Sequence, residues 1–353
     1  MAIPFSRWLT AAIGLVCGAG LYIVLVNRVL SRLRDGLVKT AFLTLAFTFF
    51  LGGFSLFGYA SGFSAWSLIL VLVLLGLALG EARYRRYRRL HQADLPISRT
   101  GRPFSILRPM TAQDLQIINY TASLPGWRGP PLRIAHLSDL HVHEHSSMDY
   151  FRSVMEQVNH SQPDLIFVTG DFAADLKGID MLPEMLQTLR SRLGSFAILG
   201  NHDYWTDAAR VREVVSQAGL DLLDSRCPHM LRDGLNQLAL VGCEAPWGRD
   251  SCTAFDVQEN IPVLALSHTA DLIYALSRAG VAAVFSGHYH AGQMQLPGFG
   301  PLIVPSVYGR RFFHGHYRVG QTHLFVTAGV GESHPPLRIY CPPDILLVDL
   351  LEN

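Results

Sequence analysis

The sequence has few charged residues for its length. Of its 353 residues only 16% are charged, whereas 49% are hydrophobic, and the mean hydropathy is +0.23. A soluble domain usually carries about 25% charged residues, so we expect part of this chain to lie in lipid. The composition argues against a disordered or wholly soluble chain. At about 150 residues per domain, the length allows two or three domains.

Cysteine pairs and several common catalytic motifs are also missing. The five cysteines are Cys17, Cys227, Cys243, Cys252 and Cys341. No two of them form a CxxC pair, which argues against a zinc ribbon, and small core thiols in a reducing compartment explain them. The sequence has no GxSxG elbow and no GxxxxGK[ST] loop, so serine hydrolase and P-loop functions lack their usual signatures.

Basic and acidic residues are unevenly distributed along the chain. Residues 1–90 hold ten of the 29 Lys and Arg and only two of the 28 acids, Asp35 and Glu81. The rest of the chain holds the other 19 basic and 26 acidic residues, a net charge of −7, and all 15 histidines. We therefore expect a basic apolar head and an acidic body. Because nucleic acid is bound by basic surfaces, we expect no nucleic-acid partner.

Three apolar runs predict a membrane region over 1–90 with about three transmembrane helices. The uncharged runs are Trp8–Val26, Thr40–Ala60 and Ser64–Leu79. A spanning helix needs about 20 residues, and the third run approaches this length once Phe63 and Gly80 are included. The first run has a cleaved signal peptide as its alternative. Asn27 and Arg28 follow it where small residues would mark cleavage, and two further apolar runs come later.

The positive charges predict how this head is oriented. With three spans, loop 27–39 and the body share one side of the membrane, which carries nine Lys and Arg against one at the N-terminus. The positive-inside tendency places that side in the cytoplasm, so we expect a multi-pass protein of the inner or cell membrane with a cytoplasmic body. Two or four spans would instead place the body on the other side of the membrane. The arginines at 83–89 suit anionic lipid head groups better than nucleic acid.

The body begins with a polar linker, 91–114, and continues as alternating strands and helices over 115–353. We expect strands at 115–124, 132–138, 164–169, 195–199, 220–223, 238–242, 263–267, 281–286, 302–304, 323–327 and 345–350. We expect helices at 149–158, 180–193, 208–218 and 272–279. This alternation predicts an α/β fold with a parallel-rich sheet covered by helices, and the many later strands predict a second sheet.

Polar side chains follow five of the predicted strands at the point where each strand ends. They are Asp139 with His141, Asp171, Asn201 with His202, His268, and His288 with His290. Because ligands collect at the carboxyl ends of strands in open α/β sheets, we expect these side chains to converge. Each motif alone also fits a surface turn, a helix cap or a buried polar pair, but their joint occurrence predicts a metal site.

The ligand types indicate which metals such a site holds. Oxygen and imidazole donors without thiolate favour Mn²⁺, Fe²⁺ or Zn²⁺. The eight donor residues are too many for one ion, whereas two ions sharing one carboxylate accommodate them. Two-metal sites stabilise in-line displacement at phosphorus, and two divalent ions with two aspartates keep a net positive charge that suits an anionic phosphate ester.

These motifs together resemble those of the calcineurin-like metallophosphoesterases. The matching residues are Asp139-x-His141, Gly170-Asp171, Gly200-Asn201-His202-Asp203, His268 and Gly287-His288-x-His290, and the resemblance covers about 115–350. Gly292-Gln293, Tyr308-Gly309 and segment 327–331 are similar to the bacterial membrane-associated branch of YkuE- and YaeI-type phosphodiesterases. The resemblance implies a four-layered αββα sandwich over 115–353, preceded by an all-α transmembrane head.

The resemblance also implies roles for the site residues. One metal ion would be held by Asp139, His141, Asp171 and His290, and the other by Asp171, Asn201, His268 and His288. A hydroxide bridging the two divalent ions, with Mn²⁺ or Fe²⁺ fitting best and Zn²⁺ also compatible, would attack a phosphodiester or pyrophosphate bond. His202 and Asp203 would be catalytic: His202 would contact the scissile phosphate and assist the leaving oxygen, and Asp203 would orient His202.

Some residues near the motifs do not follow the branch pattern or have no assigned role. Thr269-Ala270-Asp271, Tyr289 and Ala291 replace the usual residues beside the ligands, which bears on the choice of substrate. His143 and His145 are expected on a solvated loop, although they also suggest a third metal. Arg310 and Arg311 suit a second phosphate, and His314 and His316 suit the wall of a pocket; the roles of these four are left open.

The expected function is that of a membrane-anchored phosphoesterase. A membrane head suggests a phosphate-ester substrate at the bilayer, and membrane-bound relatives of this broad group act on lipid-linked phosphate or pyrophosphate esters. A soluble phosphodiester or nucleotide is an equal candidate. A catalytically silent membrane scaffold or sensor is the alternative, against which the complete ligand set argues. A transporter is disfavoured because the three spans contain no internal charge.

Overall fold

The computed structural model describes residues 5–28, 37–64, 67–91, 96–248, 257, 260–334 and 336–352. The predicted basic loop around Arg32 and Arg34, and also Cys252, lie outside the described residues. The chain divides into two compact units. We call Met1–Leu90 with Leu302–Arg311 the helical unit, and His91–Pro301 with Phe312–Asn353 the sandwich unit.

The helical unit consists of long apolar helices. They are α1 (Phe5–Arg28), α2 (Leu37–Phe47), the π-helical turn η2 (Thr48–Gly53), α3 (Phe54–Ser61) and α4 (Ser67–His91). Among the described residues, three helical stretches are long and apolar enough to cross a membrane: Phe5–Asn27, Thr40–Ser61 and Ser67–Tyr87. The second stretch runs through α2, η2 and α3. The three stretches overlap the three apolar runs predicted from the sequence.

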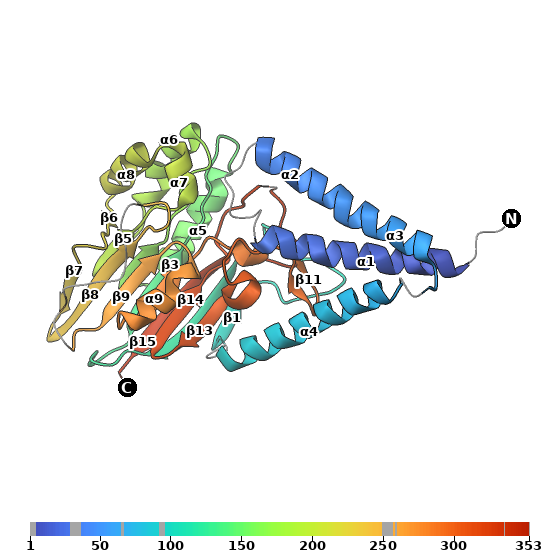
Figure 1. Ribbon diagram of the computed structural model, residues 1–353. Helices are drawn as coiled ribbons and strands as arrows, with labels where there is room; N and C mark the ends of the chain where they lie inside the picture. The colour runs from blue at the N-terminus through green and yellow to red at the C-terminus, as the bar shows by residue number, and fades with distance from the viewer. Residues whose placement is uncertain are drawn as a thin grey trace. The chain divides into compact units, whose positions relative to one another are not determined.

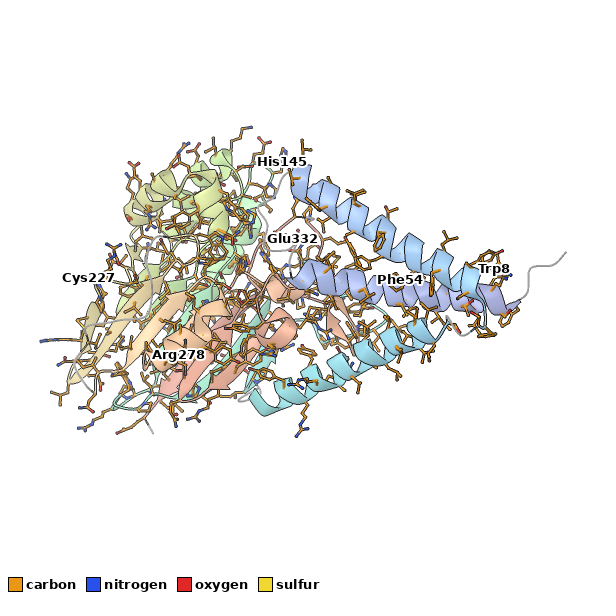
Figure 2. The ribbon with its side chains drawn as sticks, viewed as in Figure 1. Trp8, Phe54, His145, Cys227, Arg278 and Glu332 are labelled. Carbon is orange, nitrogen blue, oxygen red and sulfur yellow. The ribbon has the colours of Figure 1, made fainter. Side chains whose placement is uncertain are left out.

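Glycines let α1 pack closely on the helix formed by η2 and α3. A Cβ atom on Gly14 would lie 2.0 Å from the Phe54 carbonyl oxygen, and one on Gly58 would lie 2.0 Å from that of Thr10. Only glycine therefore allows these backbones to approach so closely, which is typical of helix pairs in membranes. Near the start of α1, Trp8 packs edge-on against Tyr59 with ring centroids 5.6 Å apart (Figure 2).

The predicted strand at 302–304 is wrong, because these residues belong to the helical unit. The Asn27 side-chain amide, near the end of α1, donates to the Leu302 carbonyl oxygen at 2.8 Å. Its oxygen accepts from the Val304 amide at 2.5 Å. The Asn27 side chain thus satisfies backbone groups that a neighbouring strand would otherwise have paired. The short apolar run at 302–304 could not reveal this contact.

The sandwich unit contains two large mixed sheets and a small one. The first has the order β1-β2-β15-β3-β4-β5-β6, with β1 (Ser98–Thr100), β2 (Gln116–Ser123), β15 (Asp344–Leu351), β3 (Leu132–Leu137), β4 (Leu165–Val168), β5 (Gly194–Ala197) and β6 (Asp221–Leu222). The second has the order β13-β14-β10-β9-β8-β7, with β13 (Gly315–Val319), β14 (Thr322–Val326), β10 (Ala283–Ser286), β9 (Val263–Ser267), β8 (Asn236–Cys243) and β7 (His229–Asp233). Strands β11 (Gln295–Leu296) and β12 (Gly300–Pro301) form a separate pair. Within the first sheet β3, β4, β5 and β6 are parallel neighbours, and within the second β8, β9, β10 and β14 are.

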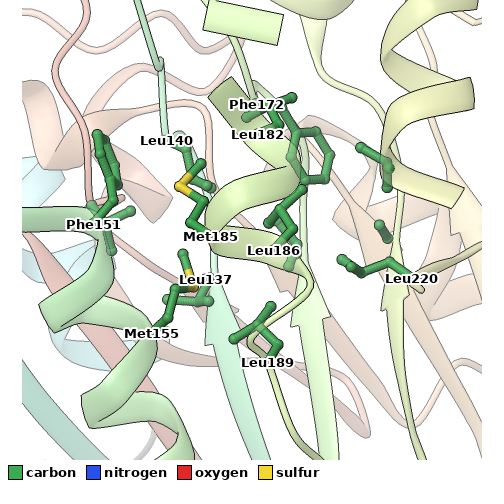
Figure 3. Close-up of a cluster of buried hydrophobic side chains, with 14 of the residues drawn as sticks. Leu137, Leu140, Phe151, Met155, Phe172, Leu182, Met185, Leu186, Leu189 and Leu220 are labelled. Atoms are coloured by element: carbon green, nitrogen blue, oxygen red, sulfur yellow. The ribbon is translucent and has the colours of Figure 1, made fainter. Parts of the chain in front are cut away.

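Alternating side chains on the strands build two separate cores. On β4, Ile166 and Val168 pack with the helices, whereas Leu165 and Phe167 pack with residues of the second sheet. The helices on this first face are α5 (Met148–His160), α6 (Leu176–Leu186) and α8 (Ala208–Gln217). Figure 3 shows apolar side chains of α5 and α6 in this core. On the other side, α9 (Ile273–Arg278) contacts β13 of the second sheet (Figure 1). The predicted four-layered αββα sandwich is confirmed.

Several element boundaries differ from those predicted. Helix α6 covers Leu176–Leu186 rather than 180–193, because Asp175 caps it: the Asp175 carboxylate accepts from the Gly178 amide at 2.6 Å. Leu189 remains buried although the helix has ended, so the apolar spacing continued beyond the helix. Within the predicted linker, Ser98–Thr100 forms β1 and pairs with β2. Strands β7 and β13 and the short helix α7 (Asn201–Thr206) were not predicted.

Candidate metal centre

The chain turns sharply after five parallel strands, and each turn carries predicted site residues. Asp139 and His141 follow β3, and Asp171 follows β4. Asn201 and His202 begin α7, shortly after β5, while His268 follows β9 and the pair His288 and His290 follows β10. The two sheets thus place these residues at the carboxyl ends of their strands.

The donor atoms include two clusters that lie next to each other. In the first, which we call the Asp139 cluster, His290 Nε2 lies 3.0 Å from His141 Nε2 and 3.4 Å from Asp139 Oδ1. In the second, the Asp171 cluster of Asp171, His268 and His288, His268 Nε2 lies 3.3 Å from Asp171 Oδ2. Asp171 Oδ2 also lies 3.4 Å from His141 Nε2, so this carboxylate faces both clusters.

The residues of both clusters fit divalent metal ions. Nitrogen and oxygen ligands bind such ions at about 2.0–2.2 Å, so two ligands of one ion lie roughly 3–3.5 Å apart. The Asn201 side-chain oxygen completes the Asp171 cluster, at 3.1 Å from His268 Nε2. All donors are imidazole, carboxylate or amide groups, and thiolate is missing from these clusters, which favours ions of the Mn²⁺, Fe²⁺ and Zn²⁺ type.

The backbone at the candidate ligands is strained. Five of them adopt left-handed backbone conformations: the φ values are 54° at Asp139, 47° at His141, 55° at Asp171, 69° at His288 and 47° at His290. A non-glycine residue in this region costs about 1–3 kcal/mol and persists only where its surroundings enforce it, most often at functional sites. Here that strain aims the donor side chains into the two clusters.

Glycine is required where the backbone crosses the site. A Cβ atom on Gly200 would lie 2.3 Å from Asp171 Oδ1, and one on Gly287 would lie 2.2 Å from Asp139 Oδ2. Any larger residue would displace a carboxylate. The glycines of the Gly200-Asn201 and Gly287-His288 motifs therefore serve the site through close packing, and their φ values are not in the left-handed region.

Burial sets the protonation of the imidazoles. It lowers the pKa of His141 to about 3, with a further contribution from His202. Burial likewise holds the pKa values of His288 and His290 well below the usual range. These rings are therefore neutral at physiological pH, which is the form that binds metal.

Asp171 and His268 behave as an ion pair. Burial alone would lower the pKa of His268, but the Asp171 carboxylate outweighs it and raises the pKa to about 9. In return, burial would raise the pKa of Asp171, but its electrostatic interactions and hydrogen bonding with neighbouring imidazoles, above all His268, outweigh burial and hold the pKa well below the usual range.

The Asp203 carboxylate is buried against backbone amides. It accepts hydrogen bonds from the amides of Asp171 (2.8 Å), Phe172 (2.8 Å), Ala173 (3.3 Å) and Gly200 (2.9 Å). These amides belong to the two turns that carry Asp171 and Asn201, so Asp203 joins the turns. Burial raises its pKa to about 7, with Asp171 adding to the effect. The orientation of His202 by Asp203 stays a prediction.

His202 lies beside the Asp139 cluster with its ring partly exposed. Its ring centroid is 4.6 Å from that of His141, in an edge-on arrangement, and its backbone amide donates to Asp171 Oδ1 at 2.8 Å. The ring is also close enough to His141 and Asp171 to share a metal with them. Its partial exposure leaves it able to contact a substrate.

Two tryptophans beside the site were not predicted. The Trp205 ring lies 4.8 Å from that of His202, and the Trp247 ring lies 5.0 Å from that of His288. Both are partly exposed. Trp205 lies three residues after His202 on α7, so this helical spacing was a usable signal. The location of Trp247, in the loop after β8, depends on tertiary packing.

A cavity of about 330 Å³ adjoins the Asp139 cluster. Its lining includes His141, together with His143, His145 and Glu332. His145 and Glu332 are labelled in Figure 2, and the His145 side chain is 81% exposed. His143 and His145 therefore lie at a solvent-accessible cavity, and the described metal clusters do not include them. Its volume is that of a small-ligand site.

Three of the departures from the branch pattern, Thr269, Asp271 and Tyr289, form one hydrogen-bonded group. The Tyr289 ring is buried, and its hydroxyl lies 2.9 Å from Thr269 Oγ1 and donates to Asp271 Oδ1 at 2.9 Å. Residues that the sequence alone singled out separately are thus in contact. Together they fix the turns after β9 and β10 that carry His268 and His288.

The four residues whose roles were left open have partners elsewhere. In the helical unit, Arg310 forms an ion pair with Glu81 and lies over Tyr84, while Arg311 lies over Tyr87, 4.5 Å from the ring centroid. In the sandwich unit, His314 Nε2 lies 2.5 Å from Asp344 Oδ2, and His316 Nε2 lies 2.9 Å from His323 Nδ1. The His316 ring is buried and packs on Phe325, as a core residue.

Comparison with known proteins identifies related chains. The family model for calcineurin-like phosphoesterase matches residues 132–292. The "uncharacterized metallophosphoesterase YkuE" of Bacillus subtilis is 30% identical over 62% of this chain and 78% of its own length. The "phosphodiesterase YaeI" of Escherichia coli is 24% identical over 75% of this chain and 98% of its own. The "UDP-2,3-diacylglucosamine pyrophosphatase LpxG" of Chlamydia muridarum is 25% identical over 62% of this chain and 84% of its own.

The contacts of Asp203 predict a mainly structural effect of its removal. Asp203→Ala leaves four buried amides without their acceptor, so we expect the free energy of unfolding to fall by about 3 kcal/mol or more. In detergent, the thermal midpoint should fall by roughly 10 °C. His202→Ala, which leaves this carboxylate in place, is the matched control. An unchanged midpoint with low activity would show instead that Asp203 acts through His202.

Proposed function

Because the chain belongs to the calcineurin-like phosphoesterase family, we propose that it is a membrane-anchored hydrolase of phosphodiester or pyrophosphate bonds. The convergence of the Asp139 and Asp171 clusters carries this proposal. A protein that kept the fold but no longer catalysed hydrolysis would not need to retain these donor residues. The complete donor set therefore argues against a catalytically silent scaffold or sensor. The family consists of metal-dependent phosphoric ester hydrolases, and relatives carry the names phosphodiesterase and pyrophosphatase.

Two divalent ions would occupy the two clusters. Asp139, His141, Asp171 and His290 would hold one ion, and Asp171, Asn201, His268 and His288 would hold the other. Asp171 would be shared, since its Oδ2 atom faces both His141 and His268. When bound, the ions activate water and neutralise the charge of the phosphoryl group. The donor set fits Mn²⁺ or Fe²⁺ best, and Zn²⁺ is also compatible.

His202 would act on the leaving group. Its ring lies beside the donor atoms of His141 and Asp171 and is partly exposed, so it can contact a phosphoryl oxygen or the leaving oxygen. Donation of a proton, or of a hydrogen bond, lowers the barrier to departure of an alkoxide. Asp203 would keep the turn that carries His202 in place through its four amide hydrogen bonds.

The substrate is proposed to be a lipid-linked phosphate or pyrophosphate ester. Three helical stretches long enough to span a membrane precede the sandwich unit in the chain. The name of the Chlamydia muridarum relative describes the pyrophosphatase of a diacylated sugar nucleotide, whose acyl chains would hold it at a bilayer. A panel of lipid-linked and soluble phosphodiesters, tested with detergent-solubilised protein and Mn²⁺, distinguishes this substrate class. Turnover confined to soluble esters would contradict it.

Removal of the shared carboxylate should abolish hydrolysis. Asp171→Ala takes one ligand from each ion, so we expect loss of most metal at both positions by elemental analysis and loss of nearly all turnover. Asp139→Ala should empty mainly one position. Asp149→Ala, at a side chain that is 92% exposed on α5, is the control and should change neither quantity. Wild-type turnover in Asp171→Ala would refute the two-ion proposal.

The role of His202 predicts a dependence on the leaving group. His202→Ala should retain both metal ions and lose about 10²–10⁴-fold in rate on an alkyl or lipid phosphodiester. It should lose far less on a nitrophenyl diester, because that leaving group departs readily as an anion. Metal content and turnover on both substrates provide the measurement. Equal losses on the two substrates would mean that His202 stabilises phosphoryl charge, and loss of metal would make it a ligand.

The catalytic part of the chain is proposed to face the cytoplasm. A reporter that is active only in the cytoplasm, fused after Asn353, should work, and one that is active only after export should be silent. Neutral replacements of the five arginines within 83–89 should produce a mixed orientation while leaving turnover in detergent unchanged. An active exported reporter on the wild-type chain would contradict three spans with this orientation.

A further inference from the structure

Arg338 is a buried cation without an acidic partner among the described residues. Only 2% of its surface is exposed, yet no described carboxylate lies within ion-pair distance of its guanidinium. Arginine stays protonated in proteins, and a buried charge is tolerated only when hydrogen bonds compensate for its lost hydration. The hydrogen bonds of the Arg338 guanidinium therefore have to compensate for its burial.

The guanidinium is held by a curved stretch of backbone. Its Nη2 atom donates to the carbonyl oxygens of Ala328 at 2.8 Å, Gly329 at 3.2 Å and Gly331 at 2.5 Å. Its Nη1 atom donates to that of Cys341 at 3.4 Å. A planar fork with several fixed donors matches such a set of carbonyls, and an ammonium group does not.

The stretch 328–331 in turn supports Asp139. The Val330 amide donates to the Ser138 carbonyl oxygen at 3.0 Å, and the Gly331 amide donates to that of Asp139 at 2.8 Å. A Cβ atom on Gly329, whose φ is 73°, would lie 2.7 Å from the Asp139 Cβ. The backbone that Arg338 holds is therefore packed directly against the turn that carries this ligand.

Arg338 also reaches the second member of the same cluster. Its Nη2 atom lies 3.4 Å from His290 Nδ1, on the opposite side of the ring from the Nε2 atom that faces Asp139. Cys341, whose carbonyl accepts from the guanidinium, donates its thiol to the His290 carbonyl oxygen at 3.1 Å. One side chain thus connects the supports of Asp139 and His290.

The Asp171 cluster is held by other contacts. The Asp171 side chain accepts from the His202 amide at 2.8 Å. His268 Nδ1 lies 2.6 Å from the Thr169 carbonyl oxygen, which fixes that ring. Within the part of the chain that the structure describes, Arg338 makes no hydrogen bond to this cluster. Its influence is therefore confined to one side of the centre.

We propose that Arg338 is the positioning residue of the Asp139 cluster, holding Asp139 and His290 at the separation at which they bind one of the two metal ions. This inference rests on the proposed two-metal function. Two opposing effects are built into the arrangement. The hydrogen bonds of the guanidinium to carbonyl oxygens favour metal binding by fixing the backbone behind Asp139 and, through Cys341, that of His290, whereas its positive charge disfavours a nearby cation. We infer that fixing the ligands dominates, because Nε, Nη1 and Nη2 each donate to a backbone carbonyl oxygen.

The test is the binding of Mn²⁺ to the full chain in detergent, by calorimetry and electron paramagnetic resonance. In the wild type we expect two bound ions with the spectrum of a coupled pair. Arg338→Met and Arg338→Lys should each weaken one site by about 10–100-fold and leave the other within about threefold. At Mn²⁺ concentrations that saturate the wild type, both variants should show one isolated ion, and excess Mn²⁺ should restore the coupled spectrum.

The two substitutions distinguish positioning from charge. Lysine keeps the charge but loses the fork, so a defect in Arg338→Lys identifies the hydrogen bonds. Tighter binding in Arg338→Met would overturn the proposal, because it would mean that charge dominates. Equal weakening of both sites, or unchanged binding, would also overturn it. If Arg338→Met does not fold, Arg338→Lys alone decides between these outcomes.

A matched control and the wild type complete the design. Arg318→Met removes an exposed arginine on β13 that bonds to Gln321, and it should bind two ions like the wild type. A wild-type chain that binds fewer than two Mn²⁺ ions would contradict the proposed function itself, and the inference with it. Two ions in the wild type and unaltered site affinities in both Arg338 variants would overturn the inference alone.

Discussion

Asp139, Asp171 and Asp203 are buried together where strands of the two sheets end, and carboxylates are tolerated there only with compensating charge or hydrogen bonds. Each of the three carboxylates is stabilised in a different way. Asp203 accepts four backbone amides, Asp171 pairs with His268, and Asp139 accepts the His288 amide at 2.9 Å while bound metal would supply the remaining compensation. The left-handed backbone at the candidate ligands and the close-packed glycines follow from bringing these groups into one small volume.

Support for the site extends well beyond the donor residues. Asp203 ties the turns after β4 and β5 together, and Tyr289 ties those after β9 and β10 through Thr269 and Asp271. Arg338 and the stretch 328–331 do the same for Asp139 and His290. Supporting residues of this kind usually affect metal affinity strongly.

The helical unit is built by a different kind of packing. Its helices approach through glycines rather than through large interlocking side chains, as at Gly14 and Gly58, which suits an environment where burial of apolar surface provides little driving force. Segment 302–311 belongs to this unit although it lies between strands of the sandwich unit in the chain. Asn27, Tyr84 and Tyr87 hold that segment, so the two units are linked by the chain at more than one point.

The sequence by itself determined the apolar helices and the α/β class, and it supplied the set of candidate site residues. Those features depend on local patterns: long uncharged runs, alternation of strand and helix, and a polar motif at each strand end. The tertiary structure alone decided the rest. Asp203 contacts amides of distant turns, Arg338 is 48 residues from His290 in the chain, and segment 302–304 pairs with Asn27 rather than with a strand. Such contacts join residues far apart in sequence, and no local pattern of polarity or spacing records which distant backbone group a buried side chain will meet.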